Sequence, residues 1–284
     1  MNKLKKSLLL VVVAFVSCLT GSSLGKVIFS LAAARTESPV HIADQRIISL
    51  HPVLTENIFA LGAGLSVVGA TDYADYPEDA KKIPRVGDSR FNLEKIISLK
   101  PTLVLAMKQP DAELEKSLMR AGIKFSSYEF GKLNDFEGLI SWLGKEVGQS
   151  RNTSSVIKKW KEDWARLPTA KLQGQKVFVE VEQQPLIAAG GDTFLSEIIE
   201  KCGFQNTFGH LRGYVPISRE AILAKPSDKI LILLDGQKKE ASEMWAKTSY
   251  RPKLVFFKPS IISRLTPRLP FETKRLCAEL KATP

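Results

Sequence analysis

The amino-acid sequence predicts an α/β fold of two lobes joined by a long helix. Short apolar runs rich in β-branched residues alternate with helical segments from Arg46 onward. Between Leu133 and Leu167 the alternation stops, and the chain is helical in period without a strand. Strands resume at Lys176. Because alternating strands and helices form parallel-rich sheets, we expect one such sheet before the helical stretch and another after it.

The first lobe is expected over residues 45–133. Its opening run RIISL, which begins at Arg46, predicts a strand. Thr55 is placed to cap the following helix, TENIFALG, and Gly62 and Gly64 are placed to end it. A phosphate-binding loop needs its glycines before a helix rather than after one, so these glycines argue against a nucleotide site.

The rest of this lobe repeats the alternation. SVVGAT predicts a strand, and the loop DYADYPEDAKKIPRVGDSRF follows it. The segment NLEKIISLKPTLVLA predicts a helix that turns Leu93, Ile96 and Ile97 inward and then a strand. AELEKSLMRAGIKFSSYE predicts a further helix and strand.

A single helix is expected to link the lobes over residues 134–168, although Gly138, Gly144 and Gly148 interrupt its pattern. The second lobe is expected over residues 169–284. Its elements are the strand KVFVEVE, a helix DTFLSEIIEKCG capped by Asp192, a helix and strand in REAILAKPSDKILILL, the run LVFFK, and a last helix ending near Leu280.

The two lobes contain a weak internal repeat. NLEKIISLKPTLVLA and SREAILAKPSDKILIL share an acid, an apolar turn, a Lys-Pro pair and a strand, in that order. Proline disfavours helical geometry in the residue before it, so each Lys-Pro ends its helix. Glu94 and Glu220 therefore occupy equivalent positions in the two lobes.

Composition indicates a globular chain whose positive charge is dispersed. The chain has 284 residues, 44% of them hydrophobic, and a formal net charge of +11. Four of the lysines lie in the first 34 residues, which contain no acid, and the later basic residues are scattered among acids. A nucleic-acid surface would collect them in one tract with aromatic residues between, so we expect no nucleic-acid partner.

Residues 1–34 have the pattern of an export signal. A positive leader, MNKLKK, precedes the apolar core SLLLVVVAFVS and the small residues that follow it. FVSC is similar to a bacterial lipoprotein signal with Cys18 as the lipid-bearing residue, which is the preferred interpretation. Cleavage after Ala34, in the run LAAA, and an uncleaved anchor are the alternatives.

The remaining cysteines are Cys202 and Cys277. An exported protein folds in an oxidising compartment, where two such thiols usually pair, so a disulfide between them is expected. Two buried free thiols would be the alternative in a cytosolic chain.

Catalytic and metal-binding patterns are sparse. The histidines are His41, His51 and His210, and the sequence has no H-x-x-x-H or C-x-x-C spacing, so no metal site and no cofactor are expected. G-x-S-x-G is also absent. The chain is therefore predicted to be a binding protein rather than an enzyme.

Loops that follow predicted strands carry residues suited to binding a ligand. They include Tyr73, Asp88, Arg90, Tyr214 and Arg264. Tyrosines supply an apolar face with a polar tip, and arginines supply a fixed positive charge. Ligands of α/β sheets bind at the carboxyl ends of strands, and a cleft between two lobes is the favoured place.

Several segments together resemble one family, the helical-backbone class of periplasmic substrate-binding proteins for cobalamin, ferric siderophores and haem, which serve ABC importers. They are SLHPVLTENIFALGAG, DYADYP, VGDSRFNLEKIISLKPTLVLA and PISREAILAKPSDKIL. The resemblance covers roughly Arg46 to Leu280. It implies two Rossmann-like lobes joined by a long backbone helix, which is the class III periplasmic-binding-protein fold.

The resemblance is strongest to the cobalamin-binding members. It implies that Glu94 and Glu220 dock the two lobes on arginines of the permease dimer, whose ATPase supplies the energy. It also supports the Cys202–Cys277 pair, through the contexts EKCGFQNTF and KRLCAEL. Tyr73, Tyr214 and Arg264 fall where those members line their cleft.

The implied cargo is cobalamin or a related corrinoid, bound by an exported monomer in the periplasm or at the outer face of the cytoplasmic membrane. An anionic ferric siderophore, which Arg90 and Arg264 would suit, is the second interpretation, and haem is the third. Another class is an envelope enzyme that modifies a corrinoid or iron chelate. A scaffold module with a degenerate cleft is the last alternative.

Overall fold

The computed structural model describes residues 45–88, 90–107, 112–167, 174–234, 238–247 and 250–282. The export signal predicted over residues 1–34, with Cys18 and the Ala34 cleavage site, lies outside these residues. The predicted two-lobe α/β fold is confirmed. In the described part, no helix has the length and apolar character needed to cross a membrane.

The first lobe is built on a parallel sheet with the strand order β2-β1-β3-β4. Ile47 and Ile48 of β1 point to opposite faces of this sheet, and both are fully buried. Burial on both faces explains why β1, β2 and β3 are mainly continuous apolar runs, whereas the less buried β4 contains polar residues. The strands are β1 (Ile47–Ser49), β2 (Val67–Ala70), β3 (Leu103–Met107) and β4 (Lys124–Tyr128).

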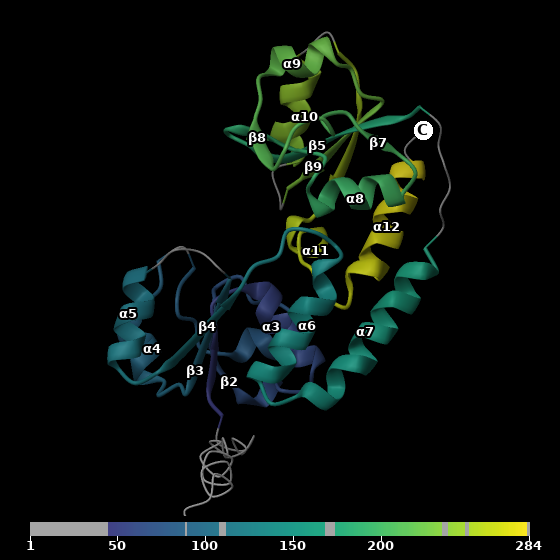
Figure 1. Cartoon of the computed structure of the whole chain (residues 1–284). Helices are drawn as coiled ribbons and strands as arrows, with labels where there is room; N and C mark the ends of the chain where they lie inside the picture. The colour runs from purple at the N-terminus through teal and green to yellow at the C-terminus, as the bar shows by residue number, and fades with distance from the viewer. Residues whose placement is uncertain are drawn as a thin grey trace, which may run out of the picture. The chain divides into compact units, whose positions relative to one another are not determined.

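Helices cover both faces of the first sheet (Figure 1). Ile48 and Val104 pack with α4 and α5, and Ile47 and Leu105 pack with α3 and α6. The helical elements of this lobe are α3 (Pro52–Ala60), η2 (Gly64–Ser66), η3 (Glu78–Lys82), α4 (Leu93–Ser98), α5 (Ala112–Arg120) and α6 (Asp135–Glu146).

The second lobe has a mixed sheet with the order β10-β9-β5-β6-β8, and β7 also pairs with β5. β10, β9, β5 and β7 are parallel, whereas β6 and β8 are antiparallel to their neighbours. The strands are β5 (Lys176–Gln183), β6 (Leu186–Ala189), β7 (Gln205–Asn206), β8 (Tyr214–Pro216), β9 (Lys229–Leu233) and β10 (Lys253–Phe257).

This sheet is also covered on both faces (Figure 1). Phe178 and Ile230 pack with α9 and α10, and Val179 and Leu231 pack with α8, α11 and α12. The helices are α8 (Phe194–Lys201), α9 (Arg219–Ala224), α10 (Lys238–Ala246), α11 (Pro259–Ile262) and α12 (Leu269–Ala282).

The linking segment is two helices, α6 and α7 (Ser150–Ala165), so the prediction of one helix over residues 134–168 is wrong. Gly148 lies between them with a φ of 68°. Glycine adopts this left-handed conformation without steric cost, and it ends a helix there. Gly144 lets the two helices approach closely, because a side chain at this position would collide with Thr153.

Three local predictions are also wrong. Thr55 lies buried inside α3, whose cap is His51: the Val53 N–H donates to His51 Nδ1 at 3.2 Å. Pro52 explains the earlier start, because proline suits the first turn of a helix. Asp192 does not cap α8, because Thr193 does. Ile97 is exposed rather than inward, since only Ile96 of α4 is fully buried.

One apolar cluster extends through both lobes. It contains Leu54 of α3, Phe136 of α6 and Trp160 of α7 from the first part of the chain, together with Ile198 of α8 and Leu276 of α12. The linking helices therefore contribute side chains to a shared core. Moving one lobe on the other would disturb this packing, because protein interiors are close-packed.

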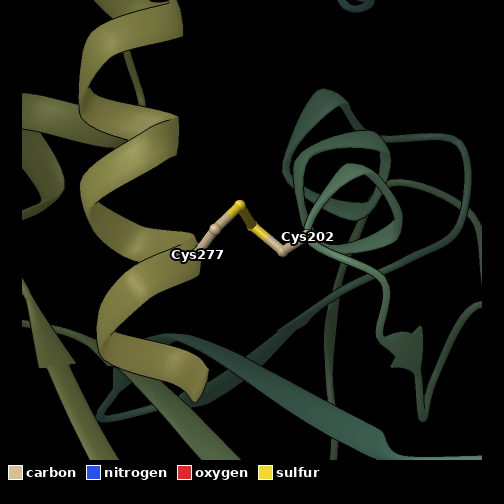
Figure 2. The surroundings of a disulfide bond; sticks show 2 residues. All are labelled: Cys202 and Cys277. Carbon is tan, nitrogen blue, oxygen red and sulfur yellow. A yellow bond between two sulfur atoms is a disulfide. The ribbon is translucent and has the colours of Figure 1, made fainter. Parts of the chain in front are cut away.

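A disulfide joins Cys202, at the end of α8, to Cys277 in α12 (Figure 2). This is the pair expected from the sequence. Both cysteines are buried, and they are 75 residues apart in the chain. Within the second lobe, the bond ties the last helix, α12, to the end of α8.

Glu180 is a buried acid in the middle of β5. It is 1% exposed, and it accepts hydrogen bonds from Trp245 Nε1 at 2.9 Å and Gln183 Nε2 at 3.2 Å. Burial raises the pKa of Glu180 to about 7, although these two hydrogen bonds and the charge of Arg219 favour the ionised form. The folded chain therefore holds a proton that the unfolded chain releases near pH 4.5.

Replacing Glu180 with glutamine should remove a pH dependence of stability. In the native chain, stability falls as pH rises from about 4.5 to about 7, because the folded state keeps the proton longer. The stability of Glu180→Gln relative to the native chain should therefore increase across this range, by up to about 3 kcal/mol. Urea denaturation at several pH values measures this. Glu182→Gln, at an exposed position of the same strand, should show no such trend; if both variants behave alike, the assignment to Glu180 is wrong.

Candidate ligand-binding site

The site lies where the loops after parallel strands meet helix α3 and the segment after β10. The loop from Thr71 to Pro77 follows β2, and Arg264 and Arg268 follow α11. Four charged residues meet here: Glu56, Asp75, Arg264 and Arg268. We call these four residues the junction cluster.

Glu56 is the centre of the junction cluster. It projects from α3 and is 4% exposed. One oxygen accepts from Arg264 Nη1 at 2.7 Å and from Arg268 Nη2 at 2.9 Å, and the other accepts from Arg268 Nε at 2.7 Å. A buried carboxylate is tolerated only when opposite charges and hydrogen bonds compensate its lost hydration, and the two arginines supply both.

Arg264 connects Glu56 to the loop after β2. Its Nη1 also pairs with Asp75, and its Nη2 donates to the backbone oxygen of Tyr73 at 2.9 Å. The structure thus brings Tyr73 and Arg264 together, as expected for one site. Arg264 is 6% exposed, however, and two carboxylates balance its charge. Its charge is therefore not free to attract an anionic ligand, as the siderophore interpretation would require.

Arg268 lies over the ring of Tyr76, with 4.6 Å from its guanidinium carbon to the ring centroid. This is a cation–π contact. A groove of about 330 Å³ adjoins it. The groove is lined by Glu56, Phe59, Ala60, Tyr76, Pro77, Pro267 and Arg268.

The tyrosines predicted to bind ligand expose aromatic surface. Tyr73 is 62% exposed and Tyr214, the first residue of β8, is 49% exposed. The remaining half of the Tyr214 side chain is covered by protein, and this partial desolvation raises its pKa to about 12. Exposed rings of this kind can stack on a large planar ligand.

Asp88 and Arg90 lie in the loop before α4. Gly87 precedes them with a φ of 100°, a conformation that favours glycine. Asp88 is partly buried, whereas Arg90 is exposed. Of the two arginines predicted to bind ligand, Arg90 is the one that faces solvent.

His51 lies beside the junction cluster. Burial, and secondarily the charge of Arg264, lower its pKa to about 4. His51 is therefore neutral at physiological pH. The described residues contain no group of three histidine, cysteine or acidic side chains that could hold a metal ion.

Glu94 and Glu220 occupy equivalent positions, as the internal repeat suggested. Each is the second residue of a six-residue helix, α4 or α9, and each is exposed. Asn92 and Ser218 cap these helices, and a parallel strand follows each of them. Its own backbone N–H and, secondarily, the hydroxyl of Ser218 lower the pKa of Glu220, which keeps it ionised. The docking role of this pair stays a prediction.

Glu56, Asp75 and Arg268 were not predicted from the sequence as residues of the site. One signal was available, because the apolar residues Phe59 and Ala60 lie three and four positions after Glu56 and therefore on its face of the predicted helix. A charged residue at such a position needs a partner. The partner itself could not be identified, since Arg264 is 208 residues away.

Comparisons with known proteins show what the chain as a whole is similar to. A family described as periplasmic binding proteins matches residues 47–248. An uncharacterised ABC transporter substrate-binding lipoprotein of Bacillus subtilis is 31% identical over 79% of this chain and 76% of its own length. A vitamin B12-binding protein of Yersinia pestis is 27% identical over 85% of this chain and 88% of its own. The crystal structure of a possible iron-binding protein from Staphylococcus epidermidis is 25% identical, with a TM-score of 0.74 over 83% of this chain and 98% of its own.

Replacing Glu56 with glutamine should destabilise the protein strongly. The substitution leaves Arg264 and Arg268 buried without their shared counter-charge, and such losses typically cost about 3–5 kcal/mol. Chemical denaturation at neutral pH measures the change. Glu78→Gln is the matched control, because Glu78 forms an exposed ion pair with Lys81, and it should cost less than about 1 kcal/mol. Equal losses in the two variants would contradict the role given to Glu56.

Proposed function

The chain belongs to the periplasmic binding protein family, and from this premise we propose that it captures cobalamin or a related corrinoid between its lobes and delivers it to an ABC importer. At the level of the family, it is a substrate-binding protein of an importer for metal chelates of the B12, haem or iron type, and not an enzyme. The choice of a corrinoid rests on one observation: the site combines exposed tyrosine rings with a junction cluster whose charges balance one another.

A corrinoid is a large chelate with broad, mostly apolar faces, and cyanocobalamin has no net charge. Tyr73 and Tyr214 offer stacking surfaces for such a molecule. Arg264, the residue that would attract an anionic cargo, is already paired with Glu56 and Asp75. The similarity to a vitamin B12-binding protein over 85% of this chain supports the same choice.

An anionic ferric siderophore is the second candidate. Arg90 is exposed near the site and could contact a negative group. The similarity to the possible iron-binding protein of Staphylococcus epidermidis is consistent with this alternative. The siderophore alternative would have to rely on Arg90 without Arg264, because Arg264 is not exposed.

The family and its lipoprotein relative imply that the chain is exported and is periplasmic or anchored to a membrane. We propose that an anchored form would lie at the outer face of the cytoplasmic membrane. We propose that lipidated Cys18 provides the attachment and that the protein acts as a monomer. Its partners are the permease and ATPase of an importer. We propose that Glu94 and Glu220 face one permease subunit each.

Titration with cyanocobalamin, a ferric hydroxamate siderophore and haemin tests the proposed cargo. Tryptophan fluorescence and calorimetry should show tight one-to-one binding of cyanocobalamin and much weaker binding of the other two. Tyr73→Ala and Tyr214→Ala should each weaken this binding by roughly tenfold, because each removes a stacking surface. Preference for the siderophore would favour the second candidate, and no binding of any chelate would contradict the proposal.

Replacing both Glu94 and Glu220 with alanine should impair uptake of the cargo by whole cells while its affinity for the purified protein stays unchanged. Both carboxylates are exposed, and charges at an interface orient the encounter with a partner. Uptake of labelled cargo and calorimetric titration measure the two effects. Glu162→Ala, at an exposed position of α7, should change neither. A loss of affinity in the double variant would show that these glutamates belong to the cargo site.

A further inference from the structure

We propose that the junction cluster positions the loop of residues 71–77, so that Arg264 affects the cargo through this loop and does not contact the cargo itself. The inference rests on the proposed function, because it assumes that Tyr73 of this loop contacts the cargo. It makes Arg264 a positioning residue. Arg264 is buried and already paired, which keeps it from the cargo, and one of its partners is the loop that carries Tyr73.

The tip of the loop is held from the second lobe at three places. Arg264 Nη2 donates to the backbone oxygen of Tyr73 at 2.9 Å, and Arg264 Nη1 pairs with the carboxylate of Asp75. The guanidinium of Arg268 covers the ring of Tyr76. Tyr73, Asp75 and Tyr76 are thus each attached to one of two arginines that lie far along the chain.

The base of the loop is attached differently, to its own lobe. The Thr71 N–H donates to the oxygen of Ser49, and Arg85 Nη1 donates to the oxygen of Thr71. The Asp72 N–H donates to the oxygen of Gly87. Within the described residues, the hydrogen bonds that reach Tyr73 and Asp75 from outside the loop come from Arg264. The position of the tip therefore depends on the second lobe.

The two arginines are themselves fixed. Glu56 binds both of them, and the neighbouring Asn57 donates from Nδ2 to the backbone oxygen of Leu265 at 3.0 Å. Successive residues of α3 thereby hold the segment that carries Arg264. A guanidinium held on both sides can fix a backbone oxygen in one place.

This arrangement should prepare the loop before the cargo arrives. Tyr73 is exposed, yet the backbone at Tyr73 is hydrogen-bonded across the lobes. Fixing a loop in its binding conformation lowers the entropy lost on binding, and this raises affinity mainly by slowing dissociation. Direct contact between Arg264 and the cargo is disfavoured, because its guanidinium is buried and already has three partners.

Asp75→Ala tests the inference, because the Asp75 side chain is half exposed and its removal should not unfold the protein. Asp72→Ala is the matched control: it lies in the same loop, removes the same charge and is exposed. Hydrogen exchange of the free protein measures the mobility of residues 71–77. Stopped-flow measurement gives the dissociation rate of whichever chelate binds in the titration above, and urea denaturation reports global stability.

Asp75→Ala should speed amide exchange in residues 71–77 and cargo dissociation, each by roughly tenfold, the size expected for one lost charge-assisted hydrogen bond. Asp72→Ala should change neither, and Asp75→Ala should lower global stability by no more than the equivalent of the same roughly tenfold change. Asp75→Asn, which keeps an acceptor, should give intermediate values. A purely structural role for Asp75 would lower global stability without a selective effect on this loop.

Two results would overturn the inference. One is equal exchange and dissociation rates in Asp75→Ala and Asp72→Ala. The other is tighter binding of an anionic chelate by Asp75→Ala with unchanged loop exchange, which would show that a released Arg264 contacts the cargo directly. If no chelate binds, the proposed function fails, whereas the exchange measurement still decides whether Arg264 positions the loop.

Discussion

The arrangement of the lobes depends on one buried carboxylate. Glu56 lies on the face of α3 that is removed from water, where an ionised side chain is costly unless opposite charges surround it. Its own lobe does not supply those charges: Arg264 and Arg268 come from the other end of the chain. A shift of α3 along the segment around Arg264 that kept the lobes packed would leave Glu56 and Arg264 buried without each other. The electrostatic requirement of one residue therefore favours one way for the two lobes to meet.

The apolar packing around this carboxylate favours the same arrangement. α3, α6 and α7 share one hydrophobic cluster with α8, α11 and α12, and the disulfide between Cys202 and Cys277 joins two of these helices. A chain linked only by a flexible segment could open widely when empty. Here the linking helices contribute buried side chains such as Phe136 and Trp160. Movements between the lobes should accordingly be small, and binding should rely on a site that is largely formed in advance.

Local patterns predicted much of the fold, because they depend on neighbouring residues. The repeat around Glu94 and Glu220 corresponds to two short capped helices, each followed by a parallel strand. The predicted strands and helices follow in the expected order, whereas β6, β7, β8 and α10 of the second lobe were not predicted. Two residues could have marked the start of α3, because both Thr55 and Pro52 suit the beginning of a helix. The helix begins at Pro52 with His51 as its cap, so Thr55 lies inside it. The junction cluster could not be predicted, because its partners are separated by about two hundred residues and no local signal pairs them. The same separation explains why Arg264 was expected to bind ligand rather than to pair with Glu56 and Asp75.

The pairing of Arg264 also changes how selectivity at this site should be understood. The chain has a formal net charge of +11, which would suggest that it attracts anionic cargo. At the junction cluster, however, two carboxylates face two guanidinium groups, so the local charge is balanced. A balanced and buried cluster contributes little long-range attraction, because its fields largely cancel. Discrimination among chelates should then depend on the shape and position of the exposed rings of Tyr73 and Tyr214. Since the backbone of Tyr73 is held by Arg264, the charges of the cluster influence the cargo by fixing geometry, and a substitution there should alter selectivity even for a cargo without net charge.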